Sequence, residues 1–204
     1  MLTKGNIRKS RFLTPKVPDY LVYDLIEGHP FYRRGYRDVL SNRKTLEEIM
    51  GSSSLQAEIL DYLKEILYTQ IGRLRYRFHS NEAGIHIANK TNLSGNLNIY
   101  EKTVLSADKI SKNYADVPPK VAVEVDISIE LEKEEQMKYI SLKTNKLLQF
   151  GTEKVIWILT ESRKVIVADS PDNWHILDWN KDIELLEGYT FNIGKYLTDE
   201  GIHF

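Results

Sequence analysis

Three absences limit what this chain of 204 residues can be. It contains no cysteine, which excludes disulfide bonds and thiolate metal sites and favours a reducing compartment. No apolar run approaches the roughly 18 residues that a membrane-spanning helix needs. The N-terminus also lacks the apolar segment of a secretory signal. The sequence therefore predicts a cytoplasmic protein.

The chain also has no excess of either charge. Its 28 lysine and arginine residues nearly balance 29 aspartate and glutamate residues, so the net charge gives no argument for a nucleic-acid or membrane partner. The first sixteen positions differ, because they contain no acidic residue but hold Lys4, Arg8, Lys9, Arg11 and Lys16. We expect residues 1–16 to form a solvated basic tail, although such tails also contact phosphate groups.

The remaining residues, 17–204, are enough for one domain with a well-packed core. Apolar residues from Leu55 to Leu67 recur at steps of three and four, which predicts a helix, and a charged amphipathic helix is expected over residues 132–150. The unbroken apolar run 155–159 predicts a strand covered on both faces. Strand, helix and strand in that order predict two parallel strands and an α/β fold with a mixed sheet.

Weaker patterns predict antiparallel strands joined by turns. Residues 20–26 and 30–34 are expected to form a hairpin that turns at Gly28. Further strands are expected at residues 74–78, 85–87, 96–100, 165–168, 175–179 and 189–191. Turns are expected at residues 81–84 and 92–95, where asparagine, serine and glycine gather.

The strongest strand signal lies at residues 121–131. Apolar residues occupy every second position there, and polar residues occupy most positions between them. If this alternation continues without interruption, Glu124 and Asp126 share one face, about 7 Å apart. Two carboxylates at that distance repel each other unless a cation, a base or open water compensates. The pair therefore indicates either a metal or acid/base site or a plain solvated face.

The neighbouring elements supply further polar groups. The polar face of strand 96–100 can lie next to Glu124 and Asp126, and the helix that follows carries Lys143 and Lys146. Carboxylates hold a hard cation such as Mg²⁺, which activates water and binds phosphate, and a nearby lysine stabilises the developing negative charge. Solvated polar faces are nevertheless common in antiparallel sheets, so the pattern alone leaves both readings open.

Other classes of site have little support. The five histidines are scattered without the spacing of metal ligands, which argues against a zinc site. The chain has no glycine-rich phosphate loop and no Gly-x-Ser-x-Gly nucleophile turn.

Three consecutive blocks resemble a known family. They are Val123-Glu-Val-Asp126, Lys143-Thr-Asn-Lys-Leu-Leu-Gln-Phe-Gly151 and Glu153-Lys-Val-Ile-Trp-Ile158. In this order they are similar to the bacterial Uma-two restriction endonuclease family, a branch of the PD-(D/E)XK nuclease superfamily. Tyr23-Asp-Leu-Ile-Glu-Gly28 also resembles the opening hairpin of that family. The similarity spans roughly residues 17–202 and keeps the order of the elements.

The resemblance implies a restriction-endonuclease-like mixed central sheet flanked by helices, and a nuclease that requires Mg²⁺ or Mn²⁺ and cleaves DNA. It makes Glu124 a metal ligand and Lys143 the helix lysine, with Lys146 as an alternative one turn away. The family's aspartate position holds Asn96 here, which supplies an oxygen but no charge, so divalent affinity should fall. Asp126 stands where the wider superfamily often has a lysine, and it is a further candidate ligand and catalytic residue.

Two functions follow from these residues. The first is a divalent-metal-dependent DNA endonuclease that is weakened by Asn96. The alternative is a catalytically inactive relative that binds nucleic acid or protein. Glu82 is a less specific acidic candidate, for which a role in a turn is the simpler reading. The resemblance also implies a homodimer.

Overall fold

The computed structural model describes residues 17–203. The basic segment 1–16 lies outside the described residues, so the prediction of a solvated tail stays a prediction. No helix within residues 17–203 is long and apolar enough to cross a membrane.

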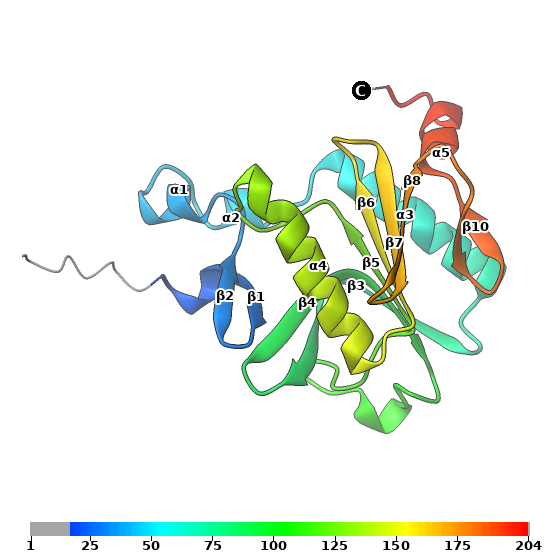
Figure 1. The fold of residues 1–204 in the computed structure, drawn as a ribbon, viewed down its shortest axis with the longest axis horizontal. Coiled ribbons are helices and arrows are strands. Elements are labelled where there is room, and N and C mark those ends of the chain that lie inside the picture. The colour runs from blue at the N-terminus through cyan, green and yellow to red at the C-terminus, as the bar shows by residue number, and fades with distance from the viewer. Residues whose placement is uncertain (1–16, 204) are drawn as a thin grey trace, which may run out of the picture.

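A large mixed sheet forms the centre of the molecule (Figure 1). Its strands follow the order β2-β1-β4-β5-β6-β7-β8, and β3 pairs with β4. The strands are β1 (Val22–Ile26), β2 (His29–Tyr32), β3 (Tyr76–Ala88), β4 (Thr91–Glu101), β5 (Val121–Val125), β6 (Lys154–Leu159), β7 (Lys164–Ser170) and β8 (Asn173–Asp178). A separate two-stranded sheet consists of β9 (Ile183–Leu186) and β10 (Tyr189–Phe191).

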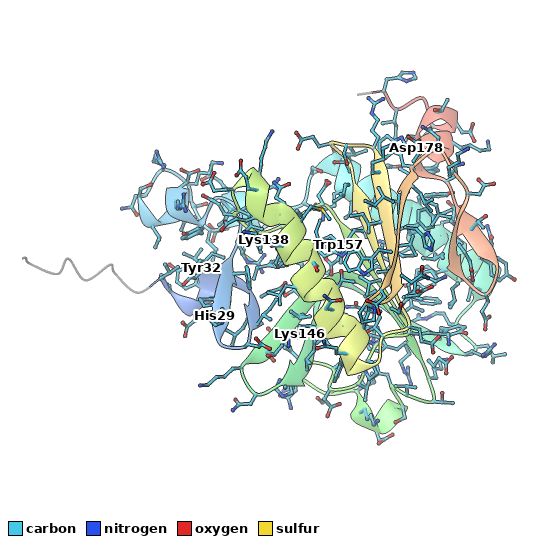
Figure 2. The ribbon with its side chains drawn as sticks, in the orientation of Figure 1. His29, Tyr32, Lys138, Lys146, Trp157 and Asp178 are labelled. Atoms are coloured by element: carbon cyan, nitrogen blue, oxygen red, sulfur yellow. The ribbon has the colours of Figure 1, made fainter. Side chains whose placement is uncertain are left out.

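Helices cover both faces of the large sheet. The helices are α1 (Tyr36–Leu40), α2 (Glu47–Met50), α3 (Ser54–Ile66), α4 (Lys133–Phe150) and α5 (Ile193–Asp199). Figure 1 shows α4 across one face and α3 on the other. The α3 side packs on the odd-numbered valines of β5, and the α4 side packs on Ala122 and Trp157. Trp157 also donates a hydrogen bond of 2.9 Å to Thr144 on α4, and it is labelled next to that helix in Figure 2.

This architecture confirms the predicted α/β fold with a mixed central sheet flanked by helices. The predicted crossover is present, because α4 connects β5 to β6 and these two strands are parallel. The β1–β2 hairpin turns at Gly28 as predicted, and it lies at one end of the sheet. Gly151 ends α4 in the left-handed region, at φ 116°, where a residue without Cβ is favoured.

Three expectations about strand limits were wrong. The predicted turn at residues 92–95 lies inside β4, where Ser94 and Gly95 pair with β3. The predicted turn at 81–84 is a bulge in β3, with Asn81 and Glu82 both at positive φ. In both cases strand pairing overrides the local preference of asparagine, serine and glycine for turns.

The central strand is also shorter than predicted, since β5 ends at Val125 and not at residue 131. Asp126 adopts φ 57°, a left-handed conformation that interrupts the alternation of side chains. Its carboxylate accepts hydrogen bonds from the backbone N–H and the hydroxyl of Thr160, at 2.8 and 2.7 Å. Asp126 is therefore tied to the loop that follows β6.

We predict that Asp126→Ala lowers the free energy of unfolding by about 2–3 kcal/mol, because two hydrogen bonds are lost and alanine is strained at positive φ. Thr160→Val removes only the hydroxyl bond and should lower it by about 1 kcal/mol. Urea denaturation measures both values. An Asp126→Ala protein as stable as the wild type would contradict this account of the end of β5.

Candidate functional site

A buried cluster of three charged side chains lies between the sheet and α4. Asp24 comes from β1, Glu124 from β5 and Lys143 from α4. The Lys143 Nζ lies 3.2 Å from Asp24 Oδ2 and 3.1 Å from Glu124 Oε1. The three residues are only 0, 2 and 1% exposed, respectively. The structure thus brings together the predicted pair Glu124 and Lys143, and it adds Asp24.

Hydrogen bonds fix the cluster from two sides. Asp24 Oδ1 accepts a bond of 2.7 Å from the backbone N–H of Ser94, and Oδ2 accepts one of 2.5 Å from the Tyr139 hydroxyl. Lys143 donates a bond of 2.7 Å to the Ser94 carbonyl. Ser94 and Tyr139 lie on β4 and α4. The cluster therefore joins three neighbouring strands to the crossover helix.

Burial and charge shift the pKa values within the cluster. Burial alone lowers the pKa of Lys143, but the carboxylates of Asp24 and Glu124 more than offset this effect, so its pKa lies well above the ordinary value. Burial raises the pKa of Glu124 to about 7, since the ammonium of Lys143 compensates only in part and the charge of Asp24 adds to the rise. Glu124 can therefore take up or release a proton near neutral pH.

The least satisfied oxygen of the cluster is Glu124 Oε1. It is buried and accepts no well-aligned hydrogen bond from the described residues, although the Lys143 ammonium lies 3.1 Å away in an ion pair. Oxygens of Asp24 and Glu124 face the same point, now taken by the ammonium. Two carboxylates suit a hard cation that keeps several waters. No group of three or more acidic, histidine or cysteine side chains within residues 17–203 is arranged to hold a metal.

The other predicted ligands are engaged elsewhere. Asn96 lies on β4 and is 4% exposed, and its Oδ1 accepts a hydrogen bond of 2.8 Å from the backbone N–H of Val125. Both carboxylate oxygens of Asp126 accept hydrogen bonds from Thr160. The set Asn96, Glu124 and Asp126 is therefore not gathered around one point in this arrangement, whereas the carboxylates of Asp24 and Glu124 both face the Lys143 ammonium.

Lys146, the alternative helix lysine, lies one turn beyond Lys143 near the end of α4 (Figure 2). It contacts Glu27 at 2.5 Å, and the Glu27 side chain is 61% exposed. Lys146 is thus part of a surface ion pair between α4 and the β1–β2 hairpin. Its catalytic role, like that of Asp126, stays a prediction from the resemblance.

A polar groove of about 850 Å³ lies beside residues 126–128, directly after β5, and the three charged residues of the cluster do not line it. Asn96, Asp126 and the β3 bulge line it, together with Arg33 and the start of α3. Glu82 in the bulge is close enough to the cluster that its charge contributes to the raised pKa of Glu124. The ring of Tyr23 lies 5.0 Å from Arg33 Cζ and 5.4 Å from Lys143 Nζ, so it stands next to both the groove and the cluster.

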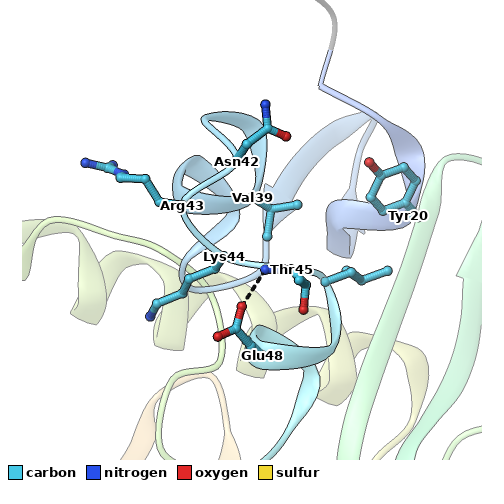
Figure 3. Close-up of a pocket in the computed structure, with 8 residues that line it drawn as sticks. Tyr20, Val39, Asn42, Arg43, Lys44, Thr45 and Glu48 are labelled. Carbon is cyan, nitrogen blue, oxygen red and sulfur yellow. Dashed lines mark hydrogen bonds between the residues drawn. The ribbon is translucent and has the colours of Figure 1, made fainter.

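A second hollow of about 480 Å³ shares Lys44 and Glu48 with the groove. Glu48 accepts a hydrogen bond of 2.6 Å from the backbone N–H of Thr45, just before α2 (Figure 3). Exposed side chains form most of this hollow, and it has no buried charge of its own. We therefore place the candidate site in the larger groove and the cluster beneath it.

Asp24 is the member of the cluster that the sequence analysis missed. A signal was present, because Asp24 is the one charged residue in the apolar run from Tyr20 to Ile26. A lone carboxylate in such a strand requires a partner once the strand is buried. The partner is distant in sequence, however, and only the pairing of β1 with β4 brings the two together.

Comparisons with known proteins show the fold class. No protein-family model matches the sequence, and no curated protein matches it. The fold is similar to the crystal structure of a putative nuclease belonging to DUF820 from Anabaena variabilis, with a TM-score of 0.60 and 11% sequence identity. The alignment covers 86% of this chain and 89% of that chain. The chain therefore shares the overall fold of that structure.

We predict that the two helix lysines differ strongly in their effect on stability. Lys143→Met leaves two buried carboxylates without their counter-ion and should lower the free energy of unfolding by about 3–5 kcal/mol. Lys146→Met removes only a surface ion pair and should leave the unfolding midpoint nearly unchanged. Denaturation of both variants tests this. Equal losses in the two proteins would contradict the central position of Lys143.

A second prediction concerns pH. The pKa of Glu124 is about 7 in the folded protein and 4.5 ordinarily, so between these pH values only the folded state holds the proton. The stability contributed by this group therefore falls as pH rises through that window. We compare the free energy of unfolding of the wild type with that of Glu124→Gln. The difference, wild type minus variant, should decrease by on the order of 3 kcal/mol as the pH rises through this window. Parallel pH profiles of the two proteins would refute the raised pKa.

Proposed function

We propose that the chain is a nuclease that hydrolyses phosphodiester bonds of DNA, with Asp24, Glu124 and Lys143 as its reactive groups. The observation that carries the proposal is the buried cluster of two carboxylates and a lysine beside a polar groove, in a fold similar to that of a putative nuclease. Buried charges with perturbed pKa values next to a groove are characteristic of catalytic sites. A purely structural role would be served as well by apolar residues of similar size.

Asp24 and Glu124 would hold a divalent cation, Mg²⁺ or Mn²⁺. Such an ion, when bound, supplies Lewis-acid activation of water and of the scissile phosphate. The Lys143 ammonium, which the two carboxylates keep charged, stabilises negative charge that develops on the phosphate. Without a metal ion the pKa of Glu124 is about 7, so a cation that binds there would displace its proton.

A second candidate function is that of a relative that binds DNA without cleaving it. Asn96 favours this alternative, because it stands at the family's aspartate position and its oxygen is already bonded to the backbone of β5. The near-complete burial of the cluster points the same way. A homodimer, which the resemblance implies, stays a prediction. Ile176 is exposed on the edge strand β8, and a dimer interface along that strand would cover it.

Calorimetric titration of Mg²⁺ and Mn²⁺, paired with cleavage of plasmid DNA by the same samples, tests the proposed function. We expect weak binding by the wild type that disappears in Glu124→Gln, with cleavage falling about 100-fold because a ligand and proton acceptor is lost. Asn96→Asp adds a negative charge beside the site and should raise both metal affinity and cleavage about tenfold or more.

Glu124→Gln keeps the size of the side chain, and circular dichroism checks that each variant is folded. Loss of metal binding and cleavage in Glu124→Gln supports the nuclease. If the wild type binds no metal up to about 10 mM and Asn96→Asp cleaves no DNA, the non-cleaving alternative holds instead.

A further inference from the structure

The groove carries more positive than negative side chains. Arg33, Arg34, Lys44 and Lys64 line it, against Glu48, Glu82 and Asp126. Arg34 forms no ion pair with any described residue. One of its guanidinium nitrogens donates a bond of 2.7 Å to the Ile127 carbonyl, which leaves its other donors for a ligand. This arrangement suits an anion.

Arg33 is held in the groove by a two-point ion pair. Its two terminal nitrogens bind the two carboxylate oxygens of Glu82, at 3.1 and 2.8 Å. A guanidinium binds carboxylate and phosphate in the same two-point geometry. The Glu82 carboxylate therefore occupies the position that a phosphate group would take on Arg33.

Glu82 is presented to Arg33 by strained backbone. Asn81 and Glu82 are consecutive non-glycine residues at φ 67° and 54°, where the pairing of β3 with β4 is interrupted. Such conformations are unfavourable and concentrate at functional sites. The Glu82 side chain is 31% exposed and that of Arg33 is 14% exposed, so Glu82 is the partner that can turn into solvent.

Asn96 adds an uncharged donor to the lining. Its Oδ1 is bonded to Val125, and its NH₂ group donates no hydrogen bond to a residue between 17 and 203. An aspartate here would repel a phosphate unless a cation intervened, whereas the amide of Asn96 can donate a hydrogen bond to it.

We propose that this groove binds the phosphodiester backbone of DNA without a metal ion, and that Arg33 exchanges Glu82 for a backbone phosphate. The inference rests on the proposed action on DNA, but it does not require cleavage. Glu82 thereby acts as an internal competitor of the DNA backbone. Removal of its charge frees Arg33 and should strengthen binding.

The test is fluorescence anisotropy of a short labelled DNA duplex with the full chain in EDTA at low salt. The wild type should bind, with an affinity that falls as salt rises. Arg33→Gln should weaken binding about tenfold, since a two-point phosphate contact is lost. Glu82→Gln should tighten DNA binding about three- to tenfold. The variant with both substitutions should bind DNA no more tightly than Arg33→Gln alone, because Glu82 acts on binding through Arg33.

Asp178→Asn is the matched control. Asp178 lies on β8 and forms an ion pair with Lys164 on β7, so the substitution removes one negative charge there. This ion pair is far along the sheet from the β1–β2 hairpin (Figure 2). We expect it to change affinity less than twofold. An equal gain in Asp178→Asn and Glu82→Gln, or no binding by the wild type in EDTA, would overturn the inference.

The outcomes also separate this inference from the proposed nuclease. Binding in EDTA with the expected response to Glu82→Gln, but no cleavage with Mg²⁺, supports the groove and refutes the nuclease. Cleavage with Mg²⁺ but no binding in EDTA refutes the metal-free groove and leaves the nuclease standing.

Discussion

The contact on which this structure depends is that of the Lys143 ammonium with Asp24 and Glu124. A fully buried charge is costly unless it is paired and hydrogen-bonded. Here the partners come from β1 and β5, and the Ser94 carbonyl of β4 completes the environment. One side chain of α4 thus positions the β1–β2 hairpin, the long strand β4 and the crossover relative to each other.

The same cluster holds two carboxylates but only one positively charged group. Two carboxylates and one ammonium carry a net negative charge, and burial, together with the charge of Asp24, raises the pKa of Glu124. Either a proton or an additional cation can supply the missing positive charge. This choice links the stability of the fold to its proposed chemistry, because the oxygen left without a hydrogen bond belongs to Glu124.

The groove above has the opposite character. Its cations outnumber its acids, and its one strongly bonded arginine is held by a carboxylate on a strained bulge. The proposed function rests on these two features, the buried charged cluster and the groove. The DNA backbone would bind in the groove, and the reactive groups would lie beneath it.

Periodicity was sufficient to predict α3, α4 and the parallel pair β5 and β6, since these elements bury continuous apolar faces. It also put Glu124 on a strand next to a helix that carries Lys143 and Lys146, and the family resemblance favoured Lys143 of the two. Asp24 could not be found in this way, as its position depends on the long-range pairing of β1 with β4. Asp126 was placed on the wrong face because a single left-handed residue ended the strand.

The most direct test of the central claim is a crystal of the wild-type protein soaked in Mn²⁺, with anomalous scattering recorded at the manganese edge. The account predicts one peak between Asp24 and Glu124, with the Lys143 ammonium displaced from its present position. A peak at Asn96 and Asp126, or none at all in a soaked crystal, would contradict the claim that this pair of carboxylates forms the metal site.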